Sequence, residues 1–161
     1  MIVIDCDFRR PTLHRAMNKS NTKNLADYLS ETASLEDVIM RDDPSGVHVI
    51  YGKTVPGQAL DFINSKRMRA LVESLGKAYD LVILDAPTTL PFADAQVLAT
   101  LSDMTLYCVA WNKTESQAIA AGLSKFYDMN YDNVGLVFTH VDMKAFRKFN
   151  DNAKNYMAEK I

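Results

Sequence analysis

The sequence predicts an α/β fold, in which a doubly wound, mainly parallel sheet is flanked by helices. Short apolar runs alternate along the chain with longer segments whose apolar residues recur at helical spacing. Alternation of this kind is typical of α/β domains. The apolar runs are unbroken, as expected for strands that are buried on both faces of a parallel sheet.

The predicted strands are apolar runs that each end at polar or turn-forming residues. The first run ends at Asp5, and the run at 81–84 is followed by Asp85 and Pro87. These endings separate the strands from the helical segments that come next. In chain order the runs cover residues 2–4, 47–51, 81–84, 104–110 and 134–138.

The predicted helices lie between these runs. The segment 65–75 has the clearest pattern, because its apolar residues form one stripe and its charged residues lie away from it. Thr114 is a possible cap for a helix at 116–127. Further helices are predicted at 24–29, 35–40 and 94–101. We expect one domain over 1–143 and a polar, weakly helical tail over 144–161.

The composition is that of an ordinary globular chain. Of the 161 residues, 48% are hydrophobic and 24% are charged, and the formal net charge is −2. Such a chain can bury a core, and without an overall basic field we expect no nucleic-acid partner. Cys6 and Cys108 have no zinc-ligand spacing around them, which favours two reduced thiols. No apolar run approaches the ~20 residues that span a bilayer.

Acidic residues follow two of the strongest predicted strands. Asp5 and Asp7 come after the first strand, and Asp85 comes directly after the run at 81–84. Parallel sheets bind ligands beyond the carboxyl ends of their strands, and clustered carboxylates suit a hydrated Mg²⁺. A nearby Asp could also act as base for an attacking hydroxyl. The alternative is that each Asp only caps a helix or forms a turn.

Two ordered motifs make the sequence resemble a known family. Asp5-x-Asp7-x-Arg9-Arg10-Pro11 follows the first strand, and the segment 79–87 (YDLVILDAP) precedes Ala93-Asp94-Ala95. They resemble the Walker A′ and Walker B motifs of the bacterial tyrosine kinases. This family belongs to the deviant-Walker (MinD/ParA-like) superfamily of P-loop ATPases, and the resemblance covers about residues 1–143.

The resemblance implies a site for Mg²⁺ and ATP or ADP in the intact parent domain. Asp7 would activate the tyrosine hydroxyl and hold the water shell of the metal, and Asp5 would support that site. Asp85 would hold Mg²⁺ through water. Arg9 would lie close to the nucleotide or to a neighbouring subunit. Thr139 occupies the place where the family often has an Asn that binds the nucleobase.

The resemblance also implies partners and a location. Kinases of this family phosphorylate tyrosines, often in a neighbouring copy within a ring, so the parent is expected to be a homo-oligomer. A membrane-anchored polysaccharide co-polymerase part or adaptor is the expected partner. The parent would then act in exopolysaccharide or capsule biosynthesis, regulating chain length from the cytoplasm at the inner face of the bacterial membrane.

One family motif has no counterpart in the sequence. No G-x-x-x-x-G-K-[ST] segment occurs, and Gly52-Lys53-Thr54 matches the loop before the helix at 65–75 instead. We therefore expect this fragment to be inactive, with apolar sheet edges exposed where the first strand of the family would lie. Two alternatives stay open: a non-catalytic interaction or oligomerisation module of a polysaccharide export system, and a partitioning-type ATPase.

Overall fold

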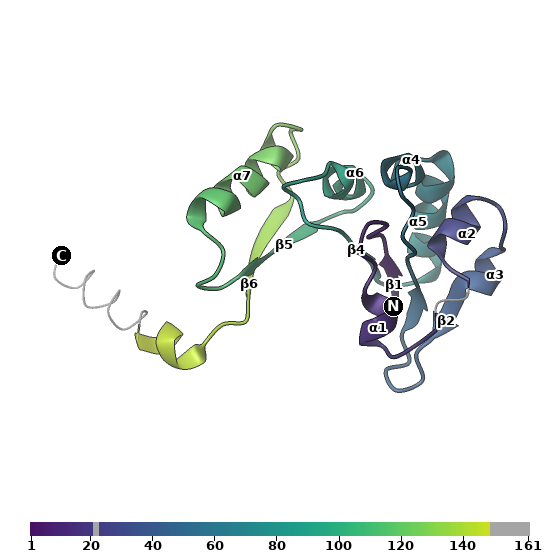
Figure 1. Cartoon of the computed structure of the whole chain (residues 1–161), viewed down its shortest axis with the longest axis horizontal. Helices are drawn as coiled ribbons and strands as arrows, with labels where there is room; N and C mark the ends of the chain where they lie inside the picture. The colour runs from purple at the N-terminus through teal and green to yellow at the C-terminus, as the bar shows by residue number, and fades with distance from the viewer. Residues whose placement is uncertain (21–22, 149–161) are drawn as a thin grey trace. The chain divides into compact units, whose positions relative to one another are not determined.

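The computed structural model describes residues 1–20 and 23–148 of the chain. The chain forms two compact units, Met1–Asp103 and Met104–Ile161, and Figure 1 labels most of their helices and strands. Both units combine strands with helices, as the predicted α/β class requires. None of the described helices has the length and apolar character needed to cross a membrane.

The first unit is built on a four-stranded sheet. Its strands are β1 (Ile2–Asp5), β2 (Ile39–Arg41), β3 (His48–Ile50) and β4 (Val82–Asp85), in the order β2-β3-β1-β4. β1 pairs in parallel with both β3 and β4. Because it has a neighbour on each side, β1 buries Ile2 and Ile4 completely. The prediction of a mainly parallel sheet is confirmed.

The edge strand β2 is a correction to the sequence prediction. A helix was expected over 35–40, but the helix α3 covers only Leu35–Val38, and the chain then turns into β2. β2 pairs antiparallel with β3, placing Ile39 opposite Ile50 and Met40 opposite Val49. The ladder with β3 outweighs the local helical pattern, because it satisfies backbone groups that a frayed helix end leaves open.

Helices surround this sheet. α5 (Lys66–Ala78) is capped by Ser65, whose side chain accepts a hydrogen bond from the Met68 N–H, and it buries Met68, Leu71 and Leu75. The other helices are α1 (Leu13–Ala16), α2 (Leu25–Leu29), α4 (Ala59–Ile63) and α6 (Asp94–Ala99). α1 and α4 were not predicted, since one turn of helix is too short to show a period.

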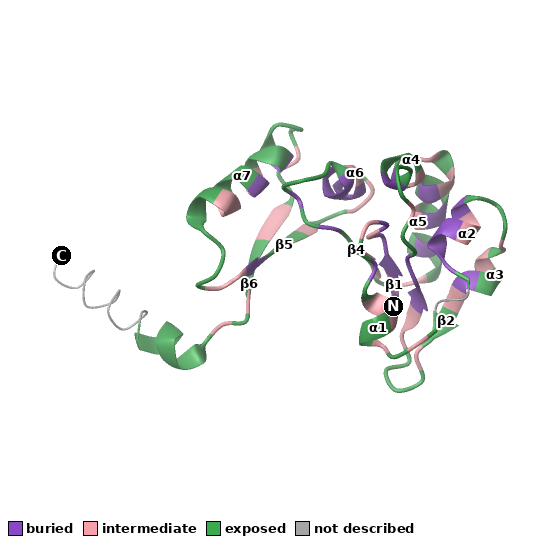
Figure 2. Ribbon diagram, in the orientation of Figure 1, coloured by how far each residue is buried: buried purple, intermediate pink, exposed green. Residues whose placement is uncertain are grey.

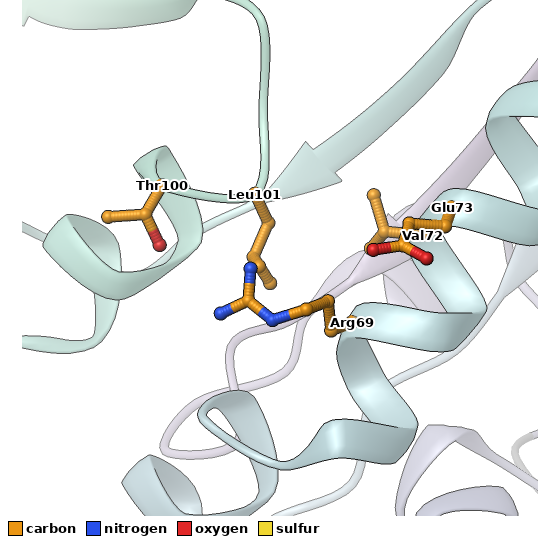
Figure 3. Close-up of a pocket in the computed structure, with 5 residues that line it drawn as sticks. All are labelled: Arg69, Val72, Glu73, Thr100 and Leu101. Atoms are coloured by element: carbon orange, nitrogen blue, oxygen red, sulfur yellow. The ribbon is translucent and has the colours of Figure 1, made fainter.

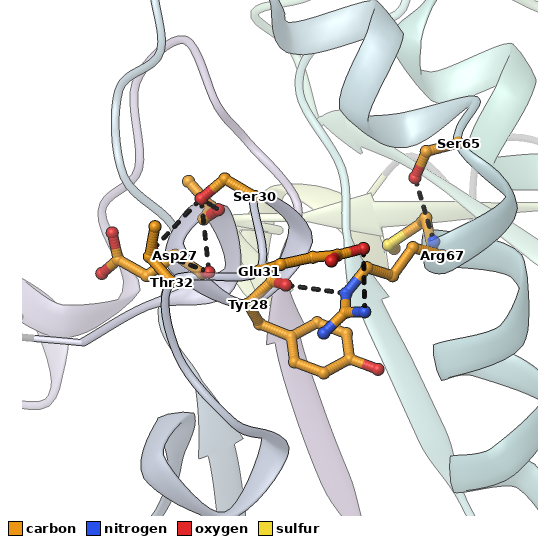
Figure 4. A network of polar contacts seen from close by, with 9 residues as sticks. Asp27, Tyr28, Ser30, Glu31, Thr32, Ser65 and Arg67 are labelled. Atoms are coloured by element: carbon orange, nitrogen blue, oxygen red, sulfur yellow. Dashed lines mark hydrogen bonds and ion pairs between the residues drawn. The ribbon is translucent and has the colours of Figure 1, made fainter.

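A polar network connects α5 to the end of α2 (Figure 4). Nε of Arg67 donates to the carbonyl oxygen of Tyr28 at 2.8 Å, and the guanidinium lies 4.4 Å from the centre of the Tyr28 ring. Nη1 of the same residue is 3.4 Å from Oε1 of Glu31. Arg67 thus combines a backbone hydrogen bond, a cation–π contact and an exposed ion pair.

The second unit is a strand–helix–strand motif. β5 (Thr105–Ala110) and β6 (Val134–Thr139) are parallel, and α7 (Ser116–Tyr127) connects them. α7 packs Phe126 against Tyr107 of β5. The predicted cap at Thr114 was wrong: Glu115 occupies the capping position, and no side chain caps the helix.

Residues 143–148 continue as an exposed helical turn. The rest of the predicted tail, 149–161, lies outside the described residues.

Burial differs sharply between strands (Figure 2). The residues of β1 are mostly buried, whereas apolar side chains of other strands are open to solvent: Ile83 is 40% exposed, Leu106 60% and Phe138 52%. An unbroken apolar strand normally has both faces covered. These strands therefore expose apolar side chains in the described chain, whereas exposure at the edge where the family's first strand would lie stays a prediction.

Candidate functional site

The candidate site lies where β1 and β4 end side by side. Asp5 and Asp85 are in register as the last residues of these parallel strands, so their carboxylates stand next to each other. The pairing continues one residue further, with the Cys6 N–H donating to the Asp85 carbonyl at 2.9 Å. Adjacent strands lie about 4.8 Å apart. The structure therefore brings together two of the acids that the sequence singled out.

Asp5 is buried and organises the backbone around it. Its Oδ1 accepts a hydrogen bond from the Asp7 N–H and its Oδ2 accepts one from the Leu13 N–H, each at 3.2 Å, and the residue is 0% exposed. Burial raises the pKa of Asp5, although these N–H groups and that of Gly52 act in the opposite direction. This geometry suits a supporting residue that shapes the loop beyond β1.

Gly52 is the residue that allows β3 to end so close to Asp5. A Cβ built on Gly52 would lie 2.6 Å from the backbone oxygen of Asp5 and 3.0 Å from its Cγ. Only glycine fits such an approach. The segment Gly52-Lys53-Thr54 lies in an irregular loop between β3 and α4, and no helix begins directly after it, whereas a phosphate-binding loop leads straight into a helix.

Asp7 lies at the start of the loop that follows β1. Its Oδ1 accepts two backbone hydrogen bonds, from the N–H of Arg9 at 2.9 Å and of Arg10 at 2.8 Å. These bonds fix the orientation of the carboxylate, which is half-buried rather than enclosed. An oriented, solvent-accessible carboxylate can hold metal-bound water or accept a proton.

Asp85 completes the acidic group from the side of β4. Desolvation by its surroundings raises the pKa of Asp85, and the negative charges of Asp5 and Asp7 raise it further. Negative charge gathered at one edge of the sheet favours a bound cation. The donors offered here are all hard carboxylate oxygens, and such donors suit a magnesium ion.

The described residues contain no group of three or more His, Cys, Asp or Glu side chains arranged to enclose a metal ion. That result is compatible with Mg²⁺, which keeps several waters and is commonly bound through one or two carboxylates. Asp7 and Asp85 are the residues that would hold it, because Asp5 already binds backbone N–H groups with both oxygens.

Arg9 forms a salt bridge with Asp94, the first residue of α6. Its Nε donates to Oδ2 of Asp94 at 2.6 Å and its Nη2 donates to Oδ1 at 3.0 Å, while the guanidinium lies 3.6 Å from the centre of the Phe92 ring. The Asp94 side chain is 0% exposed. Arg9 was expected to lie close to the nucleotide or to a neighbouring subunit, and its pairing with Asp94 was not predicted.

Thr139 is the last residue of β6, in the second unit. Its hydroxyl donates to the Val109 carbonyl at 3.3 Å and lies 3.2 Å from Nδ1 of His140. A role in nucleotide binding stays a prediction for this residue.

A shallow pocket of about 150 Å³ lies elsewhere on the first unit (Figure 3). It is lined by residues of α5 and by residues that follow α6: Arg69, Val72, Glu73, Thr100 and Leu101. None of the three acids lines it, so it is separate from the candidate site.

Known proteins resemble the chain in sequence and in structure. The tyrosine-protein kinase YwqD of Bacillus subtilis is 32% identical over 120 residues, which cover 74% of this chain and 51% of YwqD. The solved kinase domain of the Escherichia coli tyrosine kinase ETK matches with a TM-score of 0.82 and 28% identity, over 87% of this chain and 55% of that one. No protein-family model matches the chain.

More distant structures share the fold alone. The septum site-determining protein MinD of Pyrococcus horikoshii, solved with Mg-ADP, matches with a TM-score of 0.64 and 16% identity, over 85% of this chain and 55% of that one. The chain spans about half the length of YwqD, and 21% of a longer relative from Klebsiella pneumoniae. By sequence and by fold, the chain belongs to the bacterial tyrosine kinases, and it shares its fold with MinD.

Proposed function

We propose that this chain forms the magnesium-binding side of the ATP-dependent catalytic domain of a protein-tyrosine kinase. The observation that supports this most directly is the register of Asp5 with Asp85, with Asp7 oriented beside them. The kinase names of the relatives point the same way. In this proposal the parent protein acts in exopolysaccharide or capsule biosynthesis and regulates polysaccharide chain length.

The proposed roles follow from burial and hydrogen bonding. Asp85 and Asp7 hold the hydrated metal, and Asp7 also accepts the proton of the attacking tyrosine hydroxyl. Asp5 stays buried and holds the N–H groups of Asp7 and Leu13 in place. When bound, Mg²⁺ neutralises charge on the nucleotide phosphates.

The chain does not supply every part of such a site. The phosphate-binding loop of these ATPases provides backbone N–H groups, a Lys and a metal-binding Ser or Thr, and the sequence contains no G-x-x-x-x-G-K-[ST] segment. We therefore propose that ATP or ADP binds in the parent domain, with a loop from outside this sequence, and that the chain alone is not a competent kinase.

The partners and location in this proposal are those of a membrane-associated system. The parent assembles with further copies of itself and with a membrane-anchored polysaccharide co-polymerase part or adaptor. It works at the inner face of the bacterial membrane and does not bind nucleic acid, in keeping with the net charge of −2.

Paramagnetic Mn²⁺, used in place of Mg²⁺, tests the metal site directly. In NMR spectra of the full chain, Mn²⁺ should broaden the amide signals around Asp7 and Asp85 first. Asp85→Asn should abolish this selectivity, whereas Asp61→Asn, which removes an exposed acid of α4, should leave it intact. Equal broadening around Asp43, another exposed acid, would contradict the proposed site.

A non-catalytic interaction module is the second candidate. It is favoured by the apolar side chains left open on the strands, Leu106 and Phe138 among them. A folded chain that shows no localised Mn²⁺ effect would favour this module over the kinase.

A further inference from the structure

We propose that Arg9 is a positioning residue, which fixes the loop carrying Asp7 by binding Asp94 on α6. This inference rests on the proposed function in one respect only, the role of Asp7 at the metal. The contacts themselves connect the loop after β1 with the segment after β4. In this arrangement Arg9 acts on the nucleotide site through Asp7, not through its own guanidinium.

The side chain of Arg9 is held from two directions. Both oxygens of Asp94 accept hydrogen bonds from it, at 2.6 and 3.0 Å, in the paired geometry that a guanidinium fork allows. The ring of Phe92 lies 3.6 Å from the guanidinium carbon. The Asp94 side chain is fully buried, so Arg9 could move to a phosphate only by leaving a buried carboxylate unpaired.

The backbone of Arg9 is hydrogen-bonded to the side chain of Asp7. The N–H groups of Arg9 and Arg10 both donate to Oδ1 of Asp7, at 2.9 and 2.8 Å. One residue therefore binds the proposed metal ligand through its main chain and α6 through its side chain. A displacement of the Arg9 side chain would change the direction of the N–H groups that orient Asp7.

The position of Asp94 makes this connection specific to the site. Asp94 is the first residue of α6, and the loop that precedes it begins directly after Asp85, the last residue of β4 and the second proposed metal ligand. The Arg9–Asp94 pair thus joins the loop that carries Asp7 to the segment that follows Asp85. We expect it to determine how Asp7 is placed relative to Asp85.

Amide exchange with water, measured by NMR on the full chain, tests this without any metal. Asp94→Asn and Arg9→Lys should each speed exchange at the Arg10 and Arg9 positions about tenfold, as local opening requires, and leave exchange in β3 unchanged. Arg67→Lys is the matched control, because Arg67 also stacks on a ring and pairs with an acid. It should change exchange neither at residues 9 and 10 nor in β3. Arg9→Lys retains the charge, so it keeps the test open if Asp94→Asn does not fold.

Mn²⁺ affinity of the same variants separates this inference from the proposed function. If Arg9 positions Asp7, Arg9→Lys should weaken Mn²⁺ binding several-fold in parallel with faster exchange. Unchanged exchange at residues 9 and 10 in a folded variant would overturn the inference, whether or not the wild-type chain binds Mn²⁺. Faster exchange in a chain that binds no Mn²⁺ would support the loop connection while contradicting the proposed metal site.

Discussion

Two arginines of the first unit make similar contacts with different surroundings. Arg9 and Arg67 each place a guanidinium over an aromatic ring and pair with an acid of another segment. Arg9 meets Asp94 at 2.6 Å, and that acid is 0% exposed; Arg67 meets Glu31 at 3.4 Å, and that side chain is 75% exposed. Because buried and exposed ion pairs differ in what they contribute, we expect the acid's access to water to separate the effects of the two pairs on stability.

The largest expected effect comes from Arg9→Ala. It leaves Asp94 buried without its partner, and because the Arg9 side chain is 33% exposed we expect a loss toward the lower end of the about 3–5 kcal/mol that breaking a buried ion pair costs. Urea unfolding of the full chain measures the loss. In the double variant with Asp94→Ala the loss should be clearly smaller than the sum of the two single losses. A cost below about 1 kcal/mol for Arg9→Ala would show that Asp94 gains access to water, and the contrast with Arg67 would disappear.

Asp85→Asn extends the comparison to an acid without an arginine. Asp85 has a raised pKa and no arginine partner in the described structure. The raised pKa means that the native state holds this proton more tightly than the unfolded chain. Its contribution to stability is therefore highest below pH 3.8 and falls as the pH rises through the raised value.

At pH 7 without divalent metal, Asp85→Asn should accordingly stabilise the chain, by no more than about 1 kcal/mol because solvent screens an exposed carboxylate. The gain should vanish near pH 3.5, at which urea unfolding can be repeated. Asp61→Asn is the control and should change little at either pH. Destabilisation by Asp85→Asn at pH 7 would mean that the ionised carboxylate has a favourable partner instead.

Glu31→Gln should have the smallest effect. It removes the charge of an exposed partner and leaves the bond from Arg67 to the Tyr28 carbonyl intact. Exposed ion pairs contribute about 0–1 kcal/mol, so we expect a change in unfolding free energy of under about 0.5 kcal/mol, and less still in high salt. A loss of unfolding free energy above 1 kcal/mol would mean that Glu31 matters to Arg67 as Asp94 does to Arg9.

The elements predicted correctly are those with long or strongly apolar patterns. α5 and α7 show a helical period, and the strand runs are recognisable by their apolar residues alone. β2 was missed because an antiparallel partner 10 residues or so away in the chain decides its conformation, and a local pattern does not contain that information.

The position of the acids at one sheet edge could be predicted from the sequence, but the contacts around them could not. Strand ends place Asp5 and Asp85 at one edge of a parallel sheet, and this follows from topology. The pairing of Arg9 with Asp94 joins residues 85 positions apart, so no spacing rule reveals it. The closeness of Gly52 to Asp5 depends likewise on how β3 is aligned with β1.

Gly52 also limits how this site can change over evolutionary time. Any side chain at position 52 would collide with backbone and carboxylate atoms of Asp5, whereas the next two residues are exposed. In a library that samples every amino acid at 52, 53 and 54 and retains folded chains, diversity should survive at the last two positions and collapse to one residue at the first. Substitutions tolerated in this loop are therefore expected at positions 53 and 54 and not at position 52, which lies against Asp5.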